Sequence, residues 1–260
     1  MSFLKFLSSP RYLALMTFIL SCPAMHASVD FQLIKVSHLR GMCFIQPIVE
    51  KKLPPSVLQI GMELSNKKPF GLGTSNESLL ELVFRMSKGT AQIRLGSSSG
   101  IEVQTDGSYK LHRGSFLFCH KNNLSWMIKT EENSILINGT GTWMTECLTS
   151  GLKVILLEGE ITVQNGIKSK VLKSGDLVLV SAGTSMISKP MQIELPLLIG
   201  TSRLINQFPQ PLPSKSKLVS AAKVQALRIK KRYEAFVGDV KKDRKLQLWT
   251  PTSKTSLDKE

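Results

Sequence analysis

The sequence has 260 residues, of which 42% are hydrophobic and 7% are aromatic, and its formal net charge is +15. This composition supports a folded core and excludes a disordered chain or a polytopic membrane protein. Residues 214–245 carry eight Lys and three Arg against three acids, a net +8, so more than half of the excess charge lies late in the chain. The earlier part is only mildly basic, which argues against a polyanion-binding main domain.

Residues 1–27 have the pattern of a secretory signal peptide. A positively charged stretch precedes an apolar run from Tyr12 to Leu20, which is too short to span a membrane comfortably, and small residues lead to Ala27. We therefore expect export to the periplasm or cell envelope, with cleavage after Ala27. Two alternatives stay open, an uncleaved N-terminal anchor and a lipoprotein acylated at Cys22, where the local sequence is similar to a lipobox.

The mature chain keeps three cysteines, Cys43, Cys119 and Cys147, with no CxxC pair. Buried thiols that behave as small hydrophobic groups are the favoured interpretation. Because Cys119 and Cys147 each end a strand-like run, they are also predicted to approach each other on neighbouring strands, although sequence does not set the register.

Residues 31–190 are predicted to form an all-β domain, because short apolar runs alternate with Gly, Asn, Asp and Ser clusters. Asp106-Gly107 and Asn165-Gly166 are hairpin signals. The run Leu177–Val180 indicates a strand buried on both faces. Ser78–Met86 is ambiguous, since its residues favour a helix by propensity but also fit a strand.

The C-terminal part follows a different pattern. Four prolines predict that residues 191–213 are an extended linker. Residues 214–245 are predicted to form a basic amphipathic helix, and residues 246–260 a disordered tail. The apolar side of that helix is predicted to dock, and it consists of Val219, Ala222, Ala226, Ile229, Tyr233 and Phe236. The basic side, predicted to contact a partner or an anionic membrane, consists of Lys223, Arg228, Lys230, Lys231 and Arg232.

Residues 45–190 resemble the FecR domain family in its stand-alone exported form. The likeness rests on the order and spacing of several short motifs, namely Leu58–Leu64, Thr74–Phe84, Arg94–Ile101, Leu111–Phe118, Asn138–Trp143, Val154–Val163 and Val171–Val180. It implies that Ser78–Met86 is a strand. Better-known members carry a cytoplasmic anti-sigma segment before a membrane helix, and the residues preceding the β region here are assigned to targeting, so the resemblance does not extend to that signalling role.

The resulting fold prediction is a β-sandwich or jelly-roll-like domain of about twelve short strands, with a flattened β-solenoid as the alternative. The sequence predicts no catalytic residue, metal site or cofactor. His38, His112 and His120 lack a metal-binding spacing, and Gly139–Gly141 is interpreted as a tight turn between strands.

Trp126 and Trp143 are more often core than ligand platform, but if exposed they would contact a sugar. The predicted function is a non-enzymatic envelope module that binds a protein partner or an envelope polysaccharide, in signalling or scaffolding. The alternative is a periplasmic hydrolase or metal enzyme on a similar scaffold, because fold does not decide function. Nucleic acid is not expected as a partner, since the chain is predicted to be exported.

Overall fold

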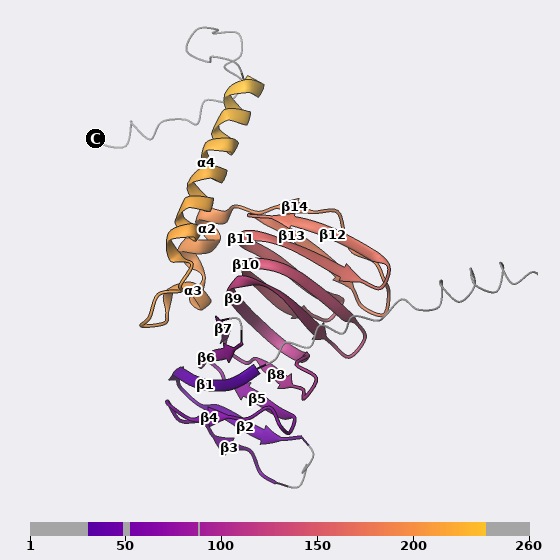
Figure 1. Cartoon of the computed structure of the whole chain (residues 1–260). Coiled ribbons are helices and arrows are strands. Elements are labelled where there is room, and N and C mark those ends of the chain that lie inside the picture. The colour runs from indigo at the N-terminus through magenta and orange to yellow at the C-terminus, as the bar shows by residue number, and fades with distance from the viewer. Residues whose placement is uncertain (1–30, 49–52, 88, 238–260) are drawn as a thin grey trace, which may run out of the picture.

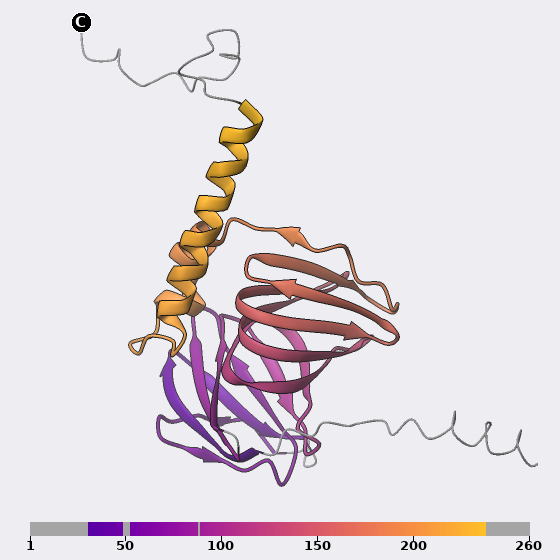
Figure 2. The same ribbon diagram turned by 45° about the horizontal axis from the view of Figure 1, so that its top comes forward.

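The computed structural model describes residues 31–48, 53–87 and 89–237. In this part of the chain, one large antiparallel sheet folds over a main hydrophobic core, and helices near the C-terminus cover part of its outer face (Figures 1 and 2). The strands are β1 (Phe31–Arg40), β2 (Cys43–Pro47), β3 (Ser56–Val57), β4 (Glu63–Leu64), β5 (Phe70–Thr74), β6 (Leu79–Met86), β7 (Gly89–Leu95), β8 (Gly100–Val103), β9 (Tyr109–Lys129), β10 (Ser134–Leu148), β11 (Gly151–Asn165), β12 (Lys168–Lys173), β13 (Asp176–Ser181) and β14 (Met191–Gln192). The helices are α2 (Leu195–Thr201), α3 (Arg203–Asn206) and α4 (Lys215–Val237).

The sheet has two layers. The first follows the order β14-β13-β11-β10-β9-β7-β6-β1-β4, and the second contains β3, β2, β5, β8 and β12. The long strands β9, β10 and β11 extend through both layers. Strand β9 pairs first with β8 and then with β7, and β11 pairs first with β13 and then with β12, while β10 pairs with β9 and β11 along its whole length. The all-β prediction is therefore confirmed. Every strand pair described is antiparallel, so the alternative of a β-solenoid with parallel stacked coils is not formed.

Glycines sit where the long strands bend from one layer to the other. Gly139 and Gly141 of β10 and Gly159 of β11 all have positive φ, at 140°, 135° and 98°. At this point the paired strands β10 and β11 lie so close together that a Cβ on Gly141 would be 2.0 Å from the carbonyl oxygen of Glu158. The prediction that Gly139–Gly141 is a tight turn between strands is wrong, because both glycines lie inside β10 and allow it to bend without ending.

The local predictions for the β region mostly hold. Asp106-Gly107 connects β8 to β9, and Asn165-Gly166 connects β11 to β12. Ser78–Met86 contains strand β6, as the resemblance implied. Leu177–Val180 lies in strand β13, but it is not buried on both faces, since Leu179 is 38% exposed.

The three thiols of the β region are free. Cys119 lies opposite Thr142 on β10, whereas Cys147 lies opposite Gly114 on β9. The two cysteines are therefore on neighbouring strands but about five residues, or roughly 17 Å, apart along them. A disulfide needs Cα atoms within about 7 Å, so the predicted approach of Cys119 and Cys147 is wrong. Burial raises the pKa of the Cys43 thiol to about 11, which keeps it protonated and unreactive.

The segment predicted to be an extended linker, residues 191–213, is instead folded. It contains β14, α2 and α3, with a proline in the first turn of α2, where the missing N–H costs no helical hydrogen bond. Leu195, Leu204 and Leu212 are buried against the outer face of the sheet. Helix α4 then occupies Lys215–Val237 of the predicted helix 214–245. The predicted signal peptide, Cys22 and the tail 246–260 lie outside the described residues.

The bend at Gly141 gives a direct test of the fold. We expect Gly141→Ala to lower the free energy of unfolding by more than about 2 kcal/mol, because the added Cβ meets a backbone carbonyl at a positive φ. Urea unfolding followed by circular dichroism measures this loss. The matched control is Gly71→Ala, where the nearest atom would be 3.8 Å away and no positive φ is required. Equal stability of the two variants would contradict the role of Gly141.

Candidate functional site

The outer face of the first layer is where the β domain meets its C-terminal helices. Register aligns one row of side chains across this face, and the row is charged at β6 and β7 and apolar from β9 to β13. Its members are Glu81, Arg94, Leu117, Met144, Ile155 and Leu177. The apolar part packs against leucines of α2, α3 and α4. The C-terminal helices therefore pack on the outer face of the sheet (Figure 1). We call the contacts that fix these helices to the sheet the mount, and they set the position of α4.

Arg94 is the centre of the first contact. Its side chain is fully buried, and Nε donates to Oε2 of Glu81 at 2.7 Å across the β6–β7 pair. Ser37 of β1 donates from Oγ to Oε1 of the same carboxylate at 2.7 Å. Burial lowers the pKa of Arg94 from its ordinary value, and the charge of Glu81 opposes that shift. The guanidinium nevertheless stays protonated, as arginine does in proteins.

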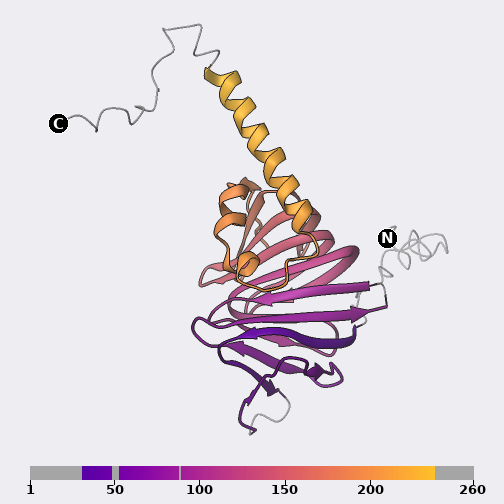
Figure 3. The ribbon, with the colours of Figure 1, turned by 90° about the vertical axis from the view of Figure 1, so that its left-hand side faces the viewer.

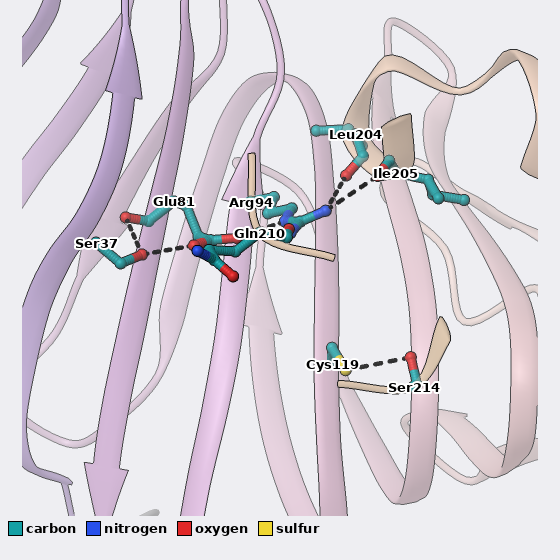
Figure 4. Close-up of polar contacts among 8 residues, drawn as sticks. All are labelled: Ser37, Glu81, Arg94, Cys119, Leu204, Ile205, Gln210 and Ser214. Carbon is teal, nitrogen blue, oxygen red and sulfur yellow. Dashed lines mark hydrogen bonds and ion pairs between the residues drawn. The ribbon is translucent and has the colours of Figure 1, made fainter. Parts of the chain in front are cut away.

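The remaining donors of Arg94 hold the C-terminal segment. Nη1 donates to the carbonyl oxygens of Leu204 at 3.0 Å and Ile205 at 3.3 Å, and Nη2 donates to that of Gln210 at 2.6 Å (Figure 4). The ring of Phe208 lies 4.2 Å from the guanidinium carbon, a cation–π contact. One buried cation thus fixes α3 and the loop that follows it to the sheet.

A chain of hydroxyl and thiol groups fixes the start of α4. Cys119, Thr142 and Glu158 are cross-strand neighbours on β9, β10 and β11, and Ser214 lies over them. Thr142 donates to Oε1 of Glu158 at 2.9 Å, so its oxygen is left to accept from Ser214 at 2.6 Å. The thiol of Cys119 donates in turn to Ser214 at 3.4 Å. The hydrogen bonds donated by Cys119, Ser214 and Thr142 therefore form one chain that ends at the buried carboxylate of Glu158.

Gln225 forms the third contact. It is 4% exposed, accepts at Oε1 from the backbone N–H of Leu195 at 2.8 Å, and donates from Nε2 to the carbonyl of Ile193 at 2.7 Å. The first N–H of α2 lacks a side-chain cap from Glu194, and Gln225 supplies the missing acceptor. A Cβ at Gly175 would lie 2.4 Å from Nε2 of Gln225, so glycine makes this approach possible.

The docking side of α4 differs from the predicted one. Val219 is 41% exposed and Ala226 is exposed, whereas Leu218 and Gln225, two turns apart, are buried. The helix is therefore rotated away from its most apolar side, because the Gln225 contact and the position of Leu218 over the sheet decide the packing. The predicted docking side, so far as its side chains are described, is partly open to solvent.

The predicted partner-contact residues lie on the open part of α4. Lys223 and Arg228 are exposed, and Val224 and Leu227 between them are 53% and 60% exposed. Within the described residues, neither cation has a carboxylate within 4 Å. Figures 1 and 3 show α4 running past the sheet into open space. The side chains of Lys230, Lys231 and Arg232 fall outside the described part.

The two predicted ligand-contact aromatics are in the core. Trp126 and Trp143 are both 0% exposed, and the ring of Phe118 lies 4.1 Å from that of Trp143 in a stacked pair. Phe118 and Trp126 also meet edge to face at 5.4 Å. No sugar can reach either indole without opening the sandwich, so the structure assigns these residues to packing.

Two histidines, His112 and His120, make polar contacts, and His38 packs edge to face against Phe208 at 5.7 Å. His112 contacts Glu102 through Nε2 at 2.8 Å and Glu131 through Nδ1 at 3.2 Å. His120 is 3% exposed, with Nδ1 placed 2.9 Å from the carbonyl of Asn122, while Nε2 accepts from the Trp143 indole. In the described ranges, no group of three or more metal-binding side chains comes together. None of the helices described there has both the length and the apolarity needed to cross a bilayer.

Sequence reasoning missed Glu81, Arg94 and Gln225. Glu81 and Arg94 each stand inside an apolar strand sequence, and once β6 pairs with β7 they lie directly opposite. A charged residue of each sign in two adjacent predicted strands was the available signal. Gln225 gave none, because a glutamine in a helix is ordinary unless its partner, the start of α2, is known.

No family model and no curated protein match this sequence. Two crystal structures of a Parabacteroides distasonis protein described as a "putative anti-sigma factor" are similar in part. One has 10% identity over 52% of this chain with a TM-score of 0.39, and the other has 10% identity over 49% with a TM-score of 0.37. The matches cover 65% and 62% of those chains, less than two thirds of their length. At this identity and TM-score, the likeness transfers neither family nor function to this chain.

The Arg94 contact predicts a strong coupling with its carboxylate. Arg94→Met leaves Glu81 buried without its partner and should cost about 3–5 kcal/mol. Adding Glu81→Gln should recover part of that loss, because the uncompensated charge is removed. Urea unfolding of the two single variants and the double variant measures the coupling. Single and double losses that simply add would show that the pair does not act as a unit.

His120 predicts a dependence of stability on pH. Burial lowers the pKa of His120, so below its ordinary value of 6.5 the unfolded chain takes up a proton that the folded chain does not. Stability should therefore fall as pH drops from 7.5 to 5, since a protonated Nε2 would face the Trp143 N–H. His120→Asn, unfolded in urea at both pH values, should lose less stability than the natural sequence. An equal loss would assign the effect to other groups.

Proposed function

We propose that this protein is a non-catalytic binding module of the bacterial cell envelope that presents α4 to a protein partner with an acidic and apolar surface. The proposal rests on the way α4 is fixed to the sheet. The helix is fixed at its base by Ser214, Leu218 and Gln225, and the rest of its length is left without cover from the sheet.

The exposed side of α4 has the composition of a recognition surface. Val224 and Leu227 supply apolar area, and Lys223 and Arg228 supply charge without an internal partner within 4 Å among the described residues. Exposed apolar side chains gain free energy by burial against a partner, while cations at the rim select an acidic one.

A protein partner fits this helix better than a lipid surface or a sugar. Apolar residues are spread around the exposed side of α4 rather than gathered in the single wide face of an interfacial helix. The aromatic side chains that would hold a sugar, Trp126 and Trp143, are buried. The predicted signal peptide in residues 1–27 and the FecR resemblance support an envelope location.

Non-catalytic binding is further supported by the contacts of His112 and His120. His112 is held between two carboxylates, and both ring nitrogens of His120 have partners. Neither imidazole is free to act as a general base toward a substrate.

The test reverses the charge of the exposed side of α4 in the full chain. Lys223→Glu/Arg228→Glu should reduce partner capture from a bacterial envelope extract at least tenfold, and capture by the natural protein should weaken as salt rises. The matched control, Lys168→Glu/Lys173→Glu, changes the same charge at exposed positions of β12 and should leave capture unchanged.

Two outcomes would contradict the proposal. Salt-sensitive sedimentation with anionic vesicles that is lost in the α4 variant, without any captured protein, would assign the helix to a membrane surface. Capture that is equally reduced in both charge variants would show a general effect of net charge.

A further inference from the structure

A second surface lies on the same outer face of the sheet, beside the region that the C-terminal helices cover. It is an open groove of about 470 Å³ between β1, β6, the start of β7 and the turn at residues 59–62. Its lining includes Leu33, Lys35, Ser37, Ile60, Val83 and Arg85. The groove has no part in the mount of α4 except through Ser37, which also bonds to Glu81.

Strand register explains the arrangement of the groove. Leu33 lies opposite Arg85, and Lys35 lies opposite Val83, so apolar and cationic side chains alternate across the β1–β6 pair. The residues between them, such as Ile34, point into the core and are buried. Leu33 and Val83 therefore form an aliphatic floor, and Lys35 and Arg85 lie diagonally opposite each other on its two strands.

Ile60 lines the side of the groove that is formed by the turn at residues 59–62. It stands at the tip of a turn whose next residue, Gly61, has φ of 87°, and it is 61% exposed. The turn is fixed to β1 by backbone hydrogen bonds between Gly61 and Val36 and between Val36 and Met62. A large aliphatic side chain is thus held in solvent beside the groove, rather than left on a free loop.

The charge of the groove is not balanced from within. In the part of the chain that the structure describes, neither Lys35 nor Arg85 has a carboxylate within 4 Å. Glu63 is the cross-strand neighbour of Lys35 on β4 but makes no such ion pair. Glu81, the acid nearest along β6, already bonds to Arg94 and Ser37. Both cations are exposed, so an acidic occupant can pair with them.

The shape and lining select the class of occupant. An open groove cannot bury most of a small molecule's surface, as small-ligand sites usually do. Among the described residues, the lining contains no aromatic ring on which a sugar would stack. Aliphatic side chains between two cations instead match an extended peptide that carries both an apolar anchor and acidic residues.

We propose that this groove binds an acidic peptide segment of a partner protein and takes an apolar side chain of that segment against Leu33, Val83 and Ile60. The cations Lys35 and Arg85 pair with carboxylates on either side of the anchor. This surface is separate from the exposed side of α4, so the groove does not depend on the function proposed for the helix.

The test selects peptides from a random twelve-residue display library on the full chain. Enriched sequences are expected to combine Glu or Asp with Leu, Ile or Phe. A synthetic peptide of the enriched sequence, labelled with fluorescein, should lose at least tenfold in affinity with Lys35→Glu/Arg85→Glu by fluorescence polarisation. Ile60→Asp, a change at an exposed turn, should weaken binding at least threefold.

Two controls separate the groove from the helix and from net charge. Lys223→Glu/Arg228→Glu on α4 and Lys168→Glu/Lys173→Glu on β12 should each leave peptide affinity within twofold. Circular dichroism should show that all the variants are folded. Enrichment of peptides without acids, no enrichment at all, or affinity lost only in the α4 variant would overturn the proposal, and the last result would assign peptide binding to the helix instead.

Discussion

The buried charge of Arg94 is the constraint on which the arrangement of this molecule depends. A guanidinium cannot be moved from water into a protein interior without full compensation, and here the compensation comes from two sides. Glu81 supplies the opposite charge from the neighbouring strand, and the carbonyls of Leu204, Ile205 and Gln210 accept the remaining hydrogens. The two sides together satisfy the buried guanidinium, which joins the sheet to its C-terminal segment.

That unit explains how an all-β domain comes to present a helix. The apolar row from Leu117 to Leu177 needs cover, and α2, α3 and the base of α4 provide it. Ser214 and Gln225 then set where α4 begins and which side faces the sheet. Because these polar contacts decide the rotation of the helix, its exposed side retains apolar residues that pure hydrophobic packing would have buried.

The two proposed surfaces share one kind of chemistry. On α4 and in the groove between β1 and β6, aliphatic side chains are exposed next to cations that have no carboxylate within 4 Å in the described residues. Such surfaces disfavour contact between copies of this chain, since like charges repel, and favour acidic partners. The hydrogen-bond path from Ser37 through Glu81 to Arg94 joins the wall of the groove to the mount of the helices.

The sequence by itself determined the all-β class, the hairpins at Asp106-Gly107 and Asn165-Gly166, and the existence of a basic C-terminal helix, because these depend on local periodicity and turn chemistry. Only the tertiary structure decided the bend at Gly139 and Gly141, the folding of residues 191–213 and the separation of Cys119 from Cys147. Each of these depends on strand register or on a partner distant in sequence. Leu195 and Leu204 are buried because the row on the sheet packs against them, and Arg94 is buried with carbonyls of α3 and of Gln210 as its acceptors. The groove likewise follows from the pairing of Leu33 with Arg85 and of Lys35 with Val83, a register that no single strand encodes.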